Sequence, residues 1–222
     1  MLLAIAKKQD FQFAEDINAA RRSTLSSQEL LALVLRNFYN IKDFEIIKDI
    51  KGKPFLKNSK FHISISHTVD LVAVCVSNCN IGLDLERVHH RKSFDLLINK
   101  VCKENEKEYL LNLNKEQQDS FFISLWTIKE ALVKYSGIGL SDLESINTFY
   151  NRDKIIYDKA INSKVNTYFL NHDVLNTNLN YYLSVVSTDK ENDLYFWDKD
   201  RNATFRKLSL PKTKSFLVVP SS

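Results

Sequence analysis

The amino-acid sequence predicts an α+β fold of two similar lobes related by a pseudo-two-fold axis, each with a helix packed on an antiparallel sheet. Several short segments alternate apolar and polar residues with a period of two, which is typical of half-buried strands. Two longer segments repeat apolar residues at the spacing of an amphipathic helix. The order of a helix, several strands and a closing apolar strand occurs in both halves of the chain. Because sequence identity between the halves is faint, this order of elements is what indicates the repeat.

The composition is that of a globular protein and argues against several other classes. Of the 222 residues, 44% are hydrophobic and 26% charged. The three cysteines are an odd, sparse set, which favours a reducing compartment over a disulfide framework. No apolar run reaches the length of a membrane span, and the N-terminus lacks a signal-peptide pattern, so we expect a cytoplasmic protein without membrane contact. The net charge of +4 suits an anionic ligand but is too small to indicate nucleic acid.

The first half of the chain is expected to form one amphipathic helix and five strands. In the helix, Leu31, Val34 and Leu35 recur on one face. One strand is apolar on both faces and is therefore expected to be central. Short polar turns join the last three strands, which predicts an antiparallel meander. The expected helix is 24–39, and the expected strands are 2–6, 44–49, 61–67, the central 71–76, and 81–87.

Two short basic segments in this half suit an anionic ligand. Arg21 and Arg22 precede the helix, where basic side chains oppose the helix dipole. Anion binding would account for them there, and solvated charges are the alternative. Gly52, Lys53 and Pro54 form a turn flanked by lysines, which by itself indicates only an exposed loop.

The strand at 81–87 carries two acids on its polar face. Its apolar residues occupy the odd-numbered positions, so Asp84 and Glu86 share the opposite face, roughly 7 Å apart. Like charges at this distance repel each other, so either a cation lies between them or the pair stays in water. The strand alone leaves both a metal site and a solvated acid pair open.

The second half begins with three helices, of which the last is the best defined. Asp119 or Ser120 caps this helix, and Gly137 ends it. Glu130 and Lys134 are four residues apart and share one face, which without further context indicates a surface ion pair. The expected helices are 94–101, 105–113 and 120–135, and the expected strands are 146–150, 154–157, 166–170, 181–186 and 216–219.

Four segments, in this order along the chain, carry a resemblance to a known family. They are Gly52-Lys53-Pro54, Ile65-Ser66-His67, the strand motif Gly82-Leu83-Asp84-Leu85-Glu86, and the helix motif WTIKEALVKYSGIGL at 126–140. Together they resemble the 4′-phosphopantetheinyl transferase superfamily, in its longer two-lobed type related to surfactin-synthetase activators. The resemblance covers about residues 20–140 and continues more weakly to 187.

The resemblance implies an enzyme that moves the 4′-phosphopantetheine group from coenzyme A to a serine hydroxyl of an apo acyl or peptidyl carrier protein. Such an enzyme uses Mg²⁺ and releases 3′,5′-ADP. Coenzyme A is expected in the cleft between the lobes, which we place at residues 1–98 and 99–222. The two-lobed type builds its site from one chain, so a monomer is expected.

The resemblance also assigns roles to single residues. Asp84, Glu86 and Glu130 would hold Mg²⁺, whose preference is for hard oxygen ligands. Glu130 would also take the proton from the serine hydroxyl, and Lys134 would contact the phosphate. The expected catalytic residues are Glu130, Lys134, Asp84 and His67. The expected contacts to coenzyme A are Arg21 or Arg22, Lys53, Pro54, Ser66, His67, Lys129 and Lys134.

Two other function classes are alternatives to the transferase hypothesis. A catalytically silent protein that binds coenzyme A or a carrier would use the same scaffold, but it has no need of Asp84, Glu86, Glu130 and Lys134 together. A basic nucleic-acid-binding protein is disfavoured by the low net charge and by the lack of a basic helix.

Overall fold

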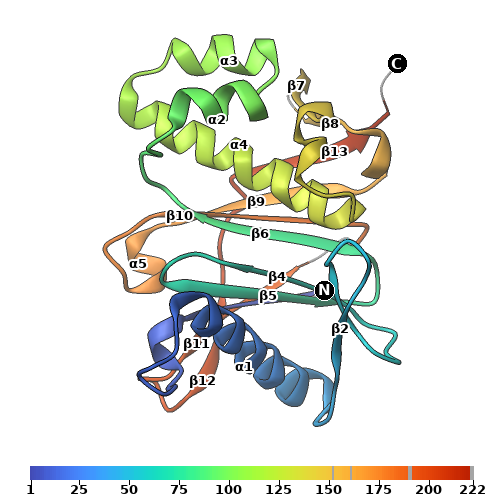
Figure 1. The fold of residues 1–222 in the computed structure, drawn as a ribbon, viewed down its shortest axis with the longest axis vertical. Coiled ribbons are helices and arrows are strands. Elements are labelled where there is room, and N and C mark those ends of the chain that lie inside the picture. The colour runs from blue at the N-terminus through green and yellow to red at the C-terminus, as the bar shows by residue number, and fades with distance from the viewer. Residues whose placement is uncertain (152, 161, 190–191, 221–222) are drawn as a thin grey trace.

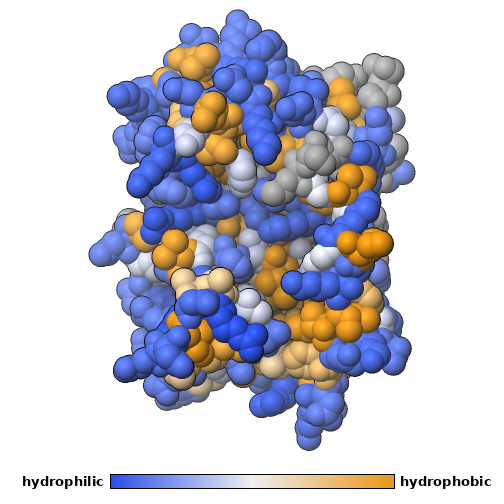
Figure 2. All heavy atoms as spheres, in the orientation of Figure 1, coloured by the Kyte–Doolittle hydropathy of each residue, from blue (hydrophilic) through white to orange (hydrophobic). Residues whose placement is uncertain are grey.

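A computed structural model gives the structure of the chain and describes residues 1–151, 153–160, 162–189 and 192–220. Its elements stack in four layers: helix α1, a five-stranded sheet, a six-stranded sheet, and helices α2 to α4 (Figure 1). Charged and polar side chains cover most of the face in view (Figure 2). Of the predicted C-terminal lobe, residues 152, 161, 190–191 and 221–222 lie outside the described residues.

The first sheet has the strand order β12-β11-β1-β5-β4, and helix α1 (Ala19–Tyr39) covers its outer face. Asn18 caps this helix by accepting a hydrogen bond from the Arg21 amide at 2.9 Å, and Asn40 ends it in the left-handed conformation. The fully buried Leu31 packs against the sheet. The strands are β1 (Leu2–Lys7), β4 (His62–His67), β5 (Leu71–Ser77), β11 (Asp193–Asp198) and β12 (Thr204–Leu208).

The second sheet has the order β6-β10-β9-β13-β8-β7 and carries helix α4 (Lys115–Ser136) on its outer face, with α2 and α3 beyond it. Gly137, at a φ of 69°, ends α4 where the sequence predicted, but the predicted cap at Asp119 or Ser120 is wrong, because Asn114 caps the helix. The other elements of this half are β6 (Ile81–Arg87), α2 (Phe94–Val101), α3 (Glu104–Leu111), β7 (Asn147–Asn151), β8 (Lys154–Ile156), β9 (Lys164–Leu170), β10 (Tyr181–Ser187) and β13 (Lys214–Val219).

Smaller elements connect these layers. Strands β2 and β3 form a separate two-stranded sheet beside β4. The elements are β2 (Ile46–Lys48), β3 (Pro54–Leu56), α5 (His172–Leu175) and the 3₁₀ turns η1 (Lys8–Asp10), η2 (Leu140–Ser145) and η3 (Asp158–Ala160).

Strand β6 lies between the core and helix α4. Its odd-numbered apolar residues are fully buried in the core between the two sheets. Because side chains alternate along a strand, Gly82, Asp84 and Glu86 lie on the opposite face, toward α4. At Gly82 a Cβ atom would overlap the carbonyl oxygen of Ala131 in α4, so only glycine permits this close approach. The absence of that side chain is what brings the two acids against the helix.

The predicted α+β class, with a long helix packed on each sheet, is confirmed, but the sheets are mixed. Strand β1 pairs with β11 in parallel, as does β13 with β8. The predicted meander is wrong: β4 and β5 form an antiparallel hairpin, whereas β6 pairs with β10. Strand β5 already pairs with β1 and β4, so neither of its edges is open to β6.

The two sheets exchange strands across the predicted boundary at residues 98 and 99. Strand β6 joins the second sheet, and β11 and β12 extend the first sheet beside β1. The division into lobes at this boundary stays a prediction. None of the helices in the described ranges combines the length and apolar character that a membrane crossing needs.

Candidate active site

Three carboxylates meet where β6 crosses α4. Asp84 is 3% exposed and Glu130 is 8% exposed, while Glu86 is partly buried. Burial, and then the charge of Asp84, raises the pKa of both Glu86 and Glu130 to about 7. Burial therefore disfavours the charged form of both glutamates, and the negative charge of Asp84 adds to the effect.

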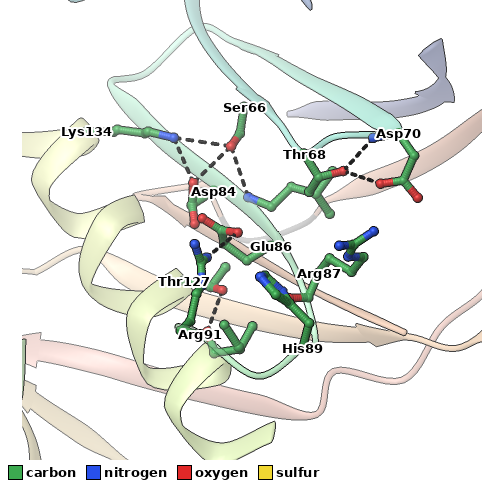
Figure 3. A network of polar contacts seen from close by, with 12 residues as sticks. Ser66, Thr68, Asp70, Asp84, Glu86, Arg87, His89, Arg91, Thr127 and Lys134 are labelled. Atoms are coloured by element: carbon green, nitrogen blue, oxygen red, sulfur yellow. Dashed lines mark hydrogen bonds and ion pairs between the residues drawn. The ribbon is translucent and has the colours of Figure 1, made fainter. Parts of the chain in front are cut away.

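Asp84 uses only one of its two oxygens. Its Oδ1 accepts hydrogen bonds from Ser66 Oγ at 2.9 Å and from Lys134 Nζ at 2.8 Å (Figure 3). Its Oδ2 is buried without a hydrogen-bond partner among the described residues. An ionised oxygen out of water and without a partner is unfavourable, so this atom is a natural ligand for a cation.

Arg91 partners the second acid of the strand. Its guanidinium donates to Glu86 Oε2 at 2.8 Å (Figure 3). The same group lies 5.7 Å from the ring centroid of Trp126 on α4. Sequence reasoning did not single out Arg91, although it follows β6 within a basic segment. Trp126, part of the helix motif, thus supports the side chain that pairs with Glu86.

A basic cavity of about 480 Å³ opens beside Glu86. Arg22 lines it, whereas Arg21 is exposed outside the lining. Buried Lys8 donates to Ser23 Oγ at 2.6 Å and to the Thr68 carbonyl at the cavity wall. With several cations and one carboxylate in its lining, the cavity suits an anion.

His67 lies at the end of β4 and lines the same cavity. Its pKa is lowered, first by burial and then by the charges of Lys8 and Lys134. Burial and the neighbouring cations therefore both favour the neutral imidazole, and an anion bound in the cavity would offset the effect of the cations.

A second cavity, of about 330 Å³, opens on the other side of the acids, with Glu130 and Lys134 in its wall. Lys53 and Pro54 also line it. The ammonium group of Lys53 donates to Asn80 Oδ1 at 2.9 Å and to the carbonyl oxygens of Tyr135 at 3.2 Å and Ile81 at 3.4 Å. Lys53 therefore fastens its turn to the C-terminal end of α4, where a cation is favourable.

Lys129 lies outside the site, which corrects the expectation that it contacts coenzyme A. Its side chain is fully buried, pairs with Glu106 at 2.7 Å and donates to the Val101 carbonyl at 2.7 Å. Consecutive helix residues are turned by about 100°, so Lys129 faces α2 and α3 while Glu130 faces β6.

The acids are not arranged as a ready-made metal cluster. In the described part of the chain, no three His, Cys, Asp or Glu side chains are placed to hold an ion together. The donor set still fits Mg²⁺, because carboxylate oxygens are the hard ligands that this ion prefers and Asp84 Oδ2 lacks a hydrogen-bond partner among the described residues.

The structure thus brings most of the predicted site residues to the two cavities and the acids between them. Pro54 and Lys53 line the second cavity, and Arg21 and Lys129 lie outside both linings. The roles assigned to these residues, and the cleft between the lobes, stay predictions. The residues around the acids are Arg22, Ser66, His67, Asp84, Glu86, Glu130 and Lys134.

Comparison with known proteins places this site within a matched segment. Residues 80–186 match the 4′-phosphopantetheinyl transferase superfamily. The chain is 32% identical over 140 residues to 4′-phosphopantetheinyl transferase psf-1 of Bacillus pumilus, covering 61% of this chain and 57% of that protein. It is 33% identical over 147 residues to 4′-phosphopantetheinyl transferase gsp of Aneurinibacillus migulanus, covering 65% and 59%. These matches span less than two thirds of the length of either relative.

Proposed function

We propose that the chain is a member of the superfamily that residues 80–186 match, the 4′-phosphopantetheinyl transferases, and that it transfers 4′-phosphopantetheine from coenzyme A to a serine hydroxyl of an apo acyl or peptidyl carrier protein. The observation that supports this most directly is the meeting of Asp84, Glu86 and Glu130 between two cavities, with Lys134 beside them. All of these residues come from one chain, which supports a monomeric enzyme. The three free cysteines support a reducing compartment such as the cytoplasm.

The proposed reaction exchanges one phosphorus–oxygen bond for another. The serine oxygen of the carrier bonds to the phosphorus that bears pantetheine. The bond from that phosphorus to the bridging oxygen breaks, and 3′,5′-ADP leaves with the electron pair. The serine proton passes to Glu130, directly or through a water.

The charges of the site suit the phosphates of coenzyme A. Asp84, Glu86 and Glu130 would hold Mg²⁺, which when bound supplies charge neutralisation at the pyrophosphate. Lys134 Nζ lies 2.8 Å from Asp84 in the wall of the second cavity and would donate to the phosphoryl oxygens as charge develops there. Lys53 fastens the turn that borders this cavity.

We expect Arg22, rather than Arg21, to bind the 3′-phosphate, because of these two arginines Arg22 is the one that lines the basic cavity. A charge-assisted hydrogen bond of this kind predicts that Arg22→Ala raises the KM for coenzyme A roughly 10- to 100-fold with little change in kcat. Arg21→Ala is the matched control and leaves the KM unchanged. Steady-state kinetics with coenzyme A and with 3′-dephospho-coenzyme A measure the effect.

Kinetics with 3′-dephospho-coenzyme A decide whether Arg22 contacts the 3′-phosphate. With 3′-dephospho-coenzyme A, the wild type and Arg22→Ala should have the same KM, since the phosphate in question is absent. A persistent difference between them would place Arg22 elsewhere on the ligand. An equal rise of KM in both arginine variants would indicate a general effect of charge.

Mass measurement of carriers tests the proposed function as a whole. The protein is incubated with coenzyme A, Mg²⁺ and a panel of apo acyl and peptidyl carriers, and each carrier is weighed. We expect a phosphopantetheine increment on at least one carrier, lost on addition of EDTA. If coenzyme A binds but no carrier of the panel gains mass, the silent binding protein is the better description.

A further inference from the structure

The edge of β6 that does not pair with β10 is held by two serines of β4. Ser64 Oγ accepts a hydrogen bond from the Leu83 amide at 2.9 Å, and Ser66 Oγ accepts one from the Leu85 amide at 3.2 Å. Both serines are buried, and both bonds span 19 residues of sequence. The two hydroxyls thus take the place of strand carbonyls and join the two sheets along one seam.

Ser66 differs from Ser64 in what else its hydroxyl contacts. It donates to Asp84 Oδ1 at 2.9 Å, and Lys134 Nζ donates to it at 3.2 Å (Figure 3). A hydroxyl has one hydrogen to donate and two positions to accept. All three are in use, so the Ser66 hydroxyl has no capacity left for a phosphate of coenzyme A.

We infer that Ser66 is a positioning residue for Asp84 and not a contact to coenzyme A. The inference deepens the proposed function and rests on its cation site. Ser66 on β4 and Lys134 on α4 hold the same oxygen, Oδ1, from the two sides of the seam. The carboxylate is therefore fixed with Oδ2, its unpartnered oxygen, left for the cation.

Ser66→Ala tests this, with Ser64→Ala as the matched control. Partners that orient a metal ligand typically change metal affinity by about 10- to 100-fold when removed. The probe is Mn²⁺, titrated by electron paramagnetic resonance into full-length protein saturated with coenzyme A, without carrier and hence without turnover. We expect Ser66→Ala to weaken Mn²⁺ binding by about 10- to 100-fold. Ser64→Ala loses an equivalent seam bond but should bind Mn²⁺ like the wild type.

Binding of coenzyme A in EDTA, measured by calorimetry, provides the second readout. A positioning role predicts the same affinity for the wild type and both variants. Weaker binding of coenzyme A by Ser66→Ala in EDTA would make Ser66 a ligand contact and overturn the inference. An equal loss of Mn²⁺ affinity in both variants, or a loss in neither, would also overturn it.

The Ser66→Cys variant and the Mn²⁺ affinity of the wild type serve as further controls. Ser66→Cys replaces the hydroxyl by a thiol, which is only a weak donor. We therefore expect this variant to behave as Ser66→Ala does, and it takes the place of Ser66→Ala if the alanine variant does not fold. A wild type that binds no Mn²⁺ removes the cation site and this inference with it. The carrier mass assay, which is performed separately, then decides whether transfer occurs without that site.

Discussion

Glu130→Gln is expected to lower the kcat of phosphopantetheine transfer by about 10²- to 10⁴-fold, the usual contribution of a general base. The variant removes both the proposed proton acceptor and one of the three carboxylates proposed to hold Mg²⁺. Glutamine has nearly the same shape, and the loss of one negative charge relieves repulsion from Asp84. The fold should therefore persist, as judged by circular dichroism and urea unfolding.

Glu116→Gln is the matched control for this experiment. Glu116 lies in the first turn of the same helix, but it is exposed and far along the helix from the acids. We expect its turnover to equal that of the wild type when the carrier is weighed over time. Undiminished turnover in Glu130→Gln would show that both the base and the metal assignment of Glu130 are wrong.

Lys129→Met is expected to reduce the free energy of unfolding by about 3 to 5 kcal/mol, because it leaves the buried charge of Glu106 without its partner. Glu106 is fully buried and joins three elements at once. It pairs with Lys129 of α4 at 2.7 Å and accepts from the Lys103 amide before α3 at 2.7 Å and from the Thr148 amide of β7 at 2.9 Å. Urea unfolding of the wild type and the variant measures the loss.

The exposed pair of Lys57 and Glu45 offers a control of equal geometry. Its nitrogen–oxygen distance is also 2.7 Å, but the two side chains are 48% and 59% exposed. Lys57→Met should cost about 1 kcal/mol or less. Similar losses in the two lysine variants would mean that burial of the Lys129 pair contributes nothing to its effect.

Local periodicity was sufficient to predict the elements that carry the site. The alternation in β6 and the helical spacing in α4 depend only on residues within a few positions of one another. Strand β6 forms as predicted, and α4 forms and ends near the predicted position but begins at Lys115, before the predicted start at 120. The end of α4 at Gly137 was also predictable from the sequence, because the left-handed backbone conformation that follows many helices favours glycine. Strands β11 and β12 were not predicted. Strand β11 depends on pairing with β1 across the length of the chain, and β12 pairs with β11.

Strand pairing could not be read in the same way. The sequence predicted that β6 would follow β5 in a meander, since short turns usually join neighbouring strands. In the structure β1 and β4 already occupy both edges of β5, and β6 pairs instead with β10, about a hundred residues later. Which strand edge remains unpaired depends on the whole sheet, so a local sequence pattern does not predict it.

The sequence by itself determined which chemical groups are present at the site: two acids on one face of a strand, and an acid and a lysine one turn apart on a helix. Only the tertiary structure decided how they are used. Lys129 and Glu130 are neighbours in one motif, yet a turn of about 100° buries the first against Glu106 and brings the second to the acids. The packing of α4 on Gly82 sets that rotation, because two backbones can approach so closely only where no side chain lies between them.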